Sequence, residues 1–161
     1  MFKIMVHRDR DSLTDVEVEI ISRSYEAEGV NIWFPEESDI EAYFCSPGYI
    51  QSLLGCTQDI AEDYLSTVKN QHPIPIRQQF DSQRAAHNQE LYALGGSPTN
   101  EDVWQAVQRR PIKGAKGKFI LKQLKNTIPR SVYSEAKIQA HDLGGNIALD
   151  LKAALERILR A

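Results

Sequence analysis

Only two segments of the sequence, residues 2–6 and 30–34, have the apolar and β-branched character of strands. The segment between them has the pattern of a helix, because Thr14 and Glu17 have the spacing of a capping box and Gly29 stands where a helix would end. The apolar stripe expected on this helix consists of Val16, Ile20, Ile21 and Tyr25. A strand, a helix and a second strand of this length predict a βαβ unit with parallel strands. In such a unit, a site is expected at the carboxyl ends of the strands.

The rest of the chain is predicted to be helical. Apolar spacing, capping residues and glycine or proline breaks place the expected helices at 40–44, 49–54, 59–68, 76–94, 100–108, 118–128, 131–142 and 147–160. Thr99 or Asn100 is expected to cap the helix at 100–108, and the apolar side of the helix at 118–128 is expected to carry Ile120, Leu121, Leu124 and Ile128. The predicted fold is therefore a predominantly helical α/β structure in one domain, 1–161, with an α/β part at 1–44 and a helical part at 45–161. Because two short parallel strands are too few for an ordinary α/β sheet, we expect the chain to be the back half of a larger α/β domain.

Composition and charge limit the classes of function. The chain is 42% hydrophobic and 25% charged, and it has no apolar run near the roughly 18 residues of a membrane span. We therefore expect a cytoplasmic protein without a membrane segment or a secretory signal. The charge is uneven, because residues 1–63 hold fourteen acids and four bases, whereas residues 103–134 hold eight bases and no acid. This asymmetry is compatible with an acidic metal pocket beside a phosphate-binding surface.

Two aspartates, Asp9 and Asp11, follow the first predicted strand in the sequence HRDRDS. In an extended segment, residues two apart point the same way, so both carboxylates and His7 can face one cation. Mg²⁺ or Mn²⁺ fits such a pair, because these ions prefer carboxylate oxygen and complete their shell with water and substrate phosphate. The alternative is a polar loop that leads into the cap at Thr14.

Three segments together resemble the C-terminal half of the Toprim domain in the OLD family of nucleases and their relatives attached to ABC-type ATPases. They are HRDRDS, then NIWFPEESDIEAYF, then KGAKGKFILKQL. That family has a DxD after a central strand, an acidic segment of the form acid-Ile-Glu-x-Tyr after the next strand, and a later Gly-Lys at the start of a helix. These features match Asp9 and Asp11, the residues 39–43, and Gly117 with Lys118.

The resemblance implies a metal-dependent endonuclease module that cleaves DNA, a fragment or split partner of an OLD-like ATPase-nuclease in bacterial defence. It implies that Asp9 and Asp11 bind Mg²⁺ or Mn²⁺, that Glu41 and Asp39 add ligands, and that Glu41 and Lys118 act in catalysis. Lys118 would meet the scissile phosphate or stabilise charge that develops there. Lys116, Lys122 and Lys125 are the residues expected to contact the DNA backbone, the last two as one helix face with Lys118.

Toprim domains also have an early glutamate after their first strand, and nothing before Phe2 supplies it. We therefore expect weak or no activity in isolation. Two alternatives stay open at this point. One is a non-catalytic helical module that docks to an ATPase partner. The other is a phosphotransferase of the haloacid-dehalogenase type with Asp9 as nucleophile, although the later aspartate pair of that family is missing.

Overall fold

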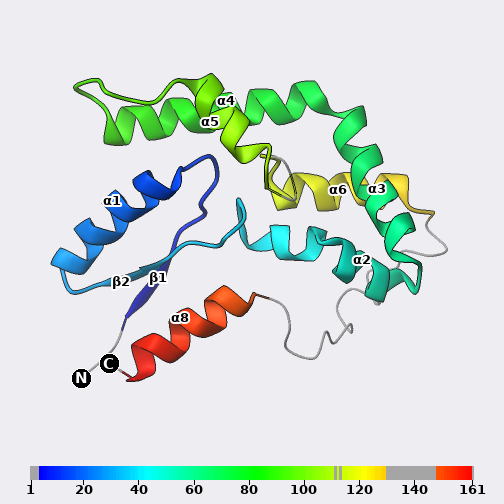
Figure 1. Ribbon diagram of the computed structural model, residues 1–161, viewed down its shortest axis with the longest axis horizontal. Helices are drawn as coiled ribbons and strands as arrows, with labels where there is room; N and C mark the ends of the chain where they lie inside the picture. The colour runs from blue at the N-terminus through cyan, green and yellow to red at the C-terminus, as the bar shows by residue number, and fades with distance from the viewer. Residues whose placement is uncertain (1–3, 111, 113, 130–147, 161) are drawn as a thin grey trace.

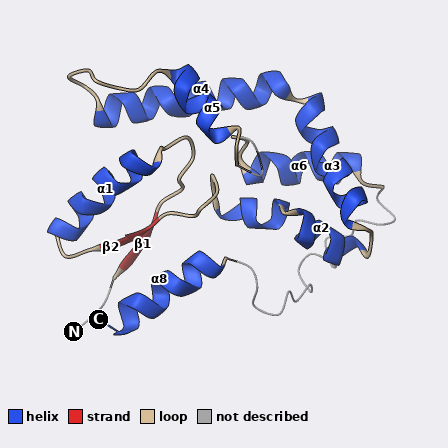
Figure 2. Ribbon diagram, viewed as in Figure 1, coloured by secondary structure: helices blue, strands red, loops and turns tan. Residues whose placement is uncertain are grey.

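The computed structural model describes residues 4–110, 112, 114–129 and 148–160 (Figure 1). The helix predicted over 131–142 lies outside these residues. In the described part of the chain, helices dominate and the strands form one two-stranded parallel sheet (Figure 2). The predicted class, a predominantly helical α/β fold, is confirmed.

The βαβ unit consists of strand β1 (Met5–His7), helix α1 (Asp15–Ala27) and strand β2 (Asn31–Trp33). The strands pair in parallel, with Val6 opposite Ile32. The capping box is present, because the Thr14 hydroxyl accepts a hydrogen bond from the Glu17 backbone N–H while the Glu17 carboxylate accepts one from the Thr14 N–H. Local sequence signals therefore fix the start of α1, and the strands end on the same side of the unit.

The apolar stripe predicted on α1 is only partly used. Ile21 is buried, but Val16 and Ile20 keep 63% and 47% of their surface exposed. The buried position near the start of the helix belongs instead to Glu17, whose carboxylate pairs with Arg84 at 2.8 and 3.0 Å, both side chains being fully buried. An ion pair from a distant helix thus replaces the packing that the periodicity predicts.

The helical part follows β2 and packs mainly around one long core. Its elements are the 3-10 helix η1 (Ile40–Cys45) and the α-helices α2 (Pro47–Leu54), α3 (Gln58–Gln71), α4 (Pro73–Leu91), α5 (Asn100–Val107) and α6 (Gly117–Thr127). Helix α6 contacts both η1 and α3. Its predicted stripe is confirmed, since Ile120, Leu124 and Ile128 are all buried in the main core cluster. Each such side chain stabilises the fold by about 1.5–3 kcal/mol.

The last described helix, α8 (Leu149–Arg160), returns to the βαβ unit and contacts β2. In the view of Figure 1, α1 and α8 lie on either side of the strand pair. Among the described helices, none combines the length and the apolar character that crossing a membrane requires.

Candidate metal centre

The three segments that carry the Toprim resemblance meet in space although they are far apart in the sequence. The backbone N–H of Asp11, in the loop after β1, donates to the carbonyl of Ser38 at 2.7 Å. The Ser38 hydroxyl donates to the carbonyl of Ala115 at 3.0 Å, and the Lys116 ammonium lies 2.9 Å from Oδ1 of Asp11. The DxD loop, the segment before η1 and the start of α6 therefore form one contact site.

Asp39 joins η1 to α6. Its side chain is 2% exposed, and its Oδ1 accepts from the backbone N–H groups of Ala42 at 3.1 Å and Gly117 at 2.9 Å. Its Oδ2 accepts from the N–H of Lys118 at 3.4 Å. Burial raises the pKa of Asp39, and the backbone N–H groups of Lys118 and Gly117 oppose that rise. Because both oxygens are engaged, we assign Asp39 a positioning role as the N-terminal cap of two helices.

The contact between η1 and α6 depends on the absence of a side chain at Gly117. A Cβ atom there would lie 2.0 Å from the backbone nitrogen of Ala42 and 2.4 Å from the carbonyl carbon of Glu41. Those atoms belong to the main chain, so no rotamer change relieves the overlap. The glycine of the Gly-Lys pair is thus required for the helix start to reach η1.

Asp9 and Asp11 lie at the carboxyl end of β1, as predicted. The side chain of Asp9 is 40% exposed and 3.4 Å from Nε2 of His7, and that of Asp11 is 18% exposed. Burial raises the pKa of Asp9, and the nearby charges of Asp11 and Glu41 raise it further, while Lys116 and His7 act in the opposite direction. The carboxylates of Asp11 and Glu41 are therefore close enough to act electrostatically on Asp9.

The predicted lysines divide into two groups. Lys116 reaches the DxD loop through its ion pair with Asp11. Lys118, Lys122 and Lys125 instead lie along the exposed side of α6, where they line a cavity together with Glu41. Glu41 therefore belongs to both regions, because its charge also acts on Asp9.

Helix α4 supplies residues that the sequence reasoning missed. Nε2 of Gln83 donates to Oδ1 of Asp11 at 3.1 Å, and Glu90 holds Arg8 in a bidentate pair at 2.6 and 2.7 Å. His87 lies between these two contacts on the helix, and both of its ring nitrogens are buried without a hydrogen-bond partner in the described part of the chain. Burial lowers the pKa of His87, and Asp11 raises it. The spacing of 83, 87 and 90 on one helix face was the only sequence signal.

The described residues supply two carboxylates, but not three side-chain ligands, for a hard divalent cation. Within 4–110, 112, 114–129 and 148–160, no three His, Cys, Asp or Glu side chains are arranged so that they could hold a metal ion. Mg²⁺, however, is commonly bound by one or two carboxylates, with water and substrate phosphate completing the shell. Asp9 and Asp11 provide that minimum, and Lys116 currently neutralises one of the oxygens.

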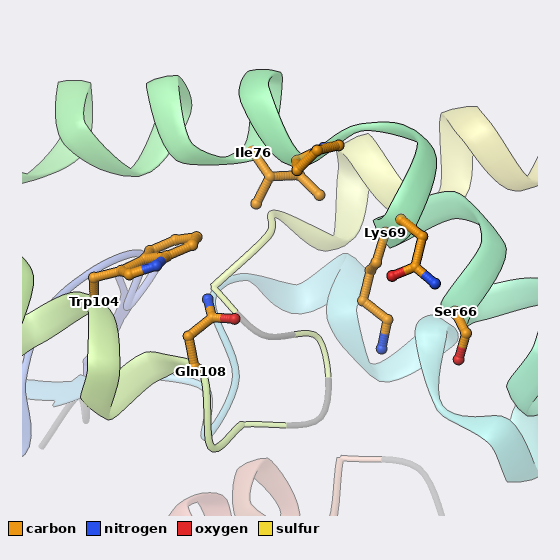
Figure 3. Close-up of a pocket in the computed structure, with 7 residues that line it drawn as sticks. Ser66, Lys69, Ile76, Trp104 and Gln108 are labelled. Carbon is orange, nitrogen blue, oxygen red and sulfur yellow. The ribbon is translucent and has the colours of Figure 1, made fainter.

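A different cavity of about 350 Å³ lies between α3, α4 and α5 (Figure 3). Trp104 and Gln108 lie on one side of it, and Ser66 and Lys69 lie on the other. Among the described residues, its lining contains no carboxylate, and carboxylate oxygens are the charged ligands that a hard cation prefers. The DxD loop is the better candidate site.

No protein-family model, curated protein or solved structure gives a significant match to this chain.

Proposed function

We propose that this chain is a metal-dependent endonuclease module of Toprim type that hydrolyses phosphodiester bonds of DNA. The observation that carries the proposal is the meeting of the DxD loop, η1 and the start of α6 through contacts among Asp11, Ser38 and Lys116. These are the segments whose sequences resemble the family, and their positions in the chain alone do not require them to touch. Their association is what a shared phosphate site would need.

The roles of the residues follow from their positions. Asp9 and Asp11 would hold Mg²⁺ or Mn²⁺ beside the scissile phosphate. Such an ion supplies an activated water and stabilises the attacking and leaving oxygens of phosphodiester cleavage. Glu41 is placed to orient groups near Asp9, because its charge already acts on that carboxyl. The exposed ammonium of Lys118 provides a positive charge for the phosphate oxygens.

The test compares nicking of supercoiled plasmid by the wild-type chain and by Asp11→Asn, with Mg²⁺ or Mn²⁺ present. Asparagine is the conservative choice because Asp11 has a φ of 49°, a left-handed conformation that asparagine tolerates. We expect at least about a tenfold loss of nicking, since even groups that merely support metal ligands contribute about 10–100-fold. Asp63→Asn, an exposed acid on α3, is the matched control and should nick as wild type does.

Equal nicking by wild type and Asp11→Asn would refute the nuclease proposal. If the wild-type chain does not nick plasmid, calorimetric titration with Mn²⁺ separates two causes. Heat of binding would mean that the metal site is present and that activity needs a further protein component. No heat of binding would mean that Asp9 and Asp11 do not form a metal site. Turnover of an aryl phosphate that depends on Asp9 would point instead to phosphotransfer.

A docking function is a second candidate, and one observation favours it. The side chains of Val16 and Ile20 leave an apolar area exposed on α1, next to a strand pair that has no third strand among the described residues. An ATPase partner is the proposed occupant. In this alternative the chain is non-catalytic, so Ile20→Lys should abolish co-purification with that ATPase and the wild-type chain should not nick plasmid.

A further inference from the structure

Helix α6 also lines a cavity that lies beside the metal centre. On the side opposite its buried stripe, Lys118, Leu121, Lys122 and Lys125 line a cavity of about 440 Å³. The other wall comes from Glu41, Phe44 and Tyr49 of η1 and α2. We call this cavity the lysine pocket. Its size lies in the range of cavities that hold small ligands.

The interior of the lysine pocket is aromatic and its rim is cationic. Phe44 and Tyr49 contact each other edge to face, with ring centroids 5.2 Å apart and an interplanar angle of 74°. Leu121 adds an aliphatic surface between the lysines. Among the described residues, the lining includes three lysines and one carboxylate, so lysines outnumber acids there. An apolar floor with a cationic rim complements a ligand that has a flat apolar part and attached negative charges.

We propose that the lysine pocket receives an unpaired base of single-stranded DNA, with the flanking phosphates at the lysines. A base stacks on aromatic side chains irrespective of sequence, and lysines follow the backbone. A base within a duplex is stacked between its neighbours and does not enter such a pocket without being extruded, so the proposal predicts a preference for single strands. The inference rests on the proposed function, because it names the substrate class of the same site.

The pocket and the metal centre share Glu41. This side chain lines the pocket, and Lys116, two residues before Lys118 of the pocket, lies 2.9 Å from Oδ1 of Asp11. A base held in the pocket therefore places a phosphodiester of the same strand close to the DxD loop. Glu41 also provides an acceptor for an amino group of the bound base, which compensates for its repulsion of phosphate.

The experiment measures binding of a fluorescent single-stranded oligonucleotide and of the matching duplex by anisotropy, with EDTA present. The wild-type chain should bind the single strand at least about tenfold more tightly than the duplex. Phe44→Leu keeps an apolar side chain and removes the stacking ring, so it should weaken single-strand binding about tenfold. Lys122→Gln should lower the salt dependence of binding by about one counterion.

Lys152→Gln, an exposed lysine on α8, is the matched control and should bind as wild type does. Circular dichroism of each variant verifies folding. Equal affinity for single strand and duplex, or unchanged binding by Phe44→Leu and Lys122→Gln together, would overturn the proposal. Tighter binding of an acidic peptide than of DNA would also overturn it and identify a protein partner. Because EDTA removes metal, binding is scored independently of nicking, and failure of either proposal is recognised separately.

Discussion

Gly117→Ala tests whether the start of α6 must lie directly on η1. The new Cβ would stand 2.0 Å from the nitrogen of Ala42, about 1 Å short of the closest approach that Cβ atoms tolerate. Both groups belong to helix backbones, so the helices must separate. A shift of that size lengthens the 2.9 Å hydrogen bond from Gly117 N–H to Asp39 beyond hydrogen-bonding range.

The expected loss of stability has two sources. Overpacking a tight contact costs about 1–3 kcal/mol. A hydrogen bond to a charged group contributes about 1.5–3 kcal/mol, and Asp39 is too buried for water to replace the lost donor. We therefore expect the free energy of unfolding to fall by about 2.5–6 kcal/mol, measured by urea denaturation followed by circular dichroism.

Gly48→Ala is the matched control, because Gly48 also lies in the first turn of a helix. A Cβ at Gly48 would have no heavy atom within 4 Å apart from its chain neighbours and the backbone of its own helix. That variant should be as stable as wild type or more stable by up to about 1 kcal/mol, since alanine favours helix. The close contact between α6 and η1 would be refuted if Gly117→Ala lost less than about 1 kcal/mol, or if both variants lost the same amount.

Three further predictions concern the charged groups. Arg84→Met leaves the buried Glu17 without its partner and should lower the free energy of unfolding by about 3–5 kcal/mol in urea denaturation. The double variant with Glu17→Leu should largely recover this loss, and a single variant as stable as wild type would contradict the prediction. Although burial raises the pKa of Glu17, hydrogen bonds from Arg84 and Thr14 leave it below its usual value. This pair therefore stabilises the fold above about pH 4.5, and the contribution is lost as the pH falls through the folded-state pKa. The free energy of unfolding should accordingly fall more between about pH 6 and pH 3 in wild type than in the double variant. Lys116→Gln removes the ammonium that neutralises Asp11 and should tighten Mn²⁺ binding up to about tenfold in calorimetry, whereas weaker binding would mean that Lys116 is needed to hold the site together.

The elements that the sequence predicts well are those set by local signals. The capping box at Thr14 and Glu17 starts α1, and Thr99 caps α5. The parallel pairing of the strands follows from the crossover helix between them. The stripe of Ile120 and Leu124 predicts the buried face of α6. Each of these features depends on residues within a few positions of each other.

The features that the sequence did not predict are contacts between distant segments. No local pattern connects Gln83 to Asp11 or Lys116 to Asp11, yet both side chains meet the same carboxylate oxygen. The burial of Glu17 was missed for the same reason, because Arg84 is 67 residues away and its charge makes burial of the carboxylate possible. Periodicity reflects apolar spacing only, so it predicts that Val16 and Ile20 are buried where the structure buries Glu17.

The position of the DxD loop therefore depends on the helical part of the chain as much as on its own strand. Asp11 is held by the carbonyl of Ser38, the amide of Gln83 and the ammonium of Lys116, which come from three different segments. Two of these contacts end on Oδ1, so a cation that approaches this oxygen must compete with a charge and a hydrogen bond. A cation at this oxygen would displace Lys116, the residue before α6, and the released ammonium would then be available to a phosphate. In this arrangement, the substrate and the cation would each favour the binding of the other.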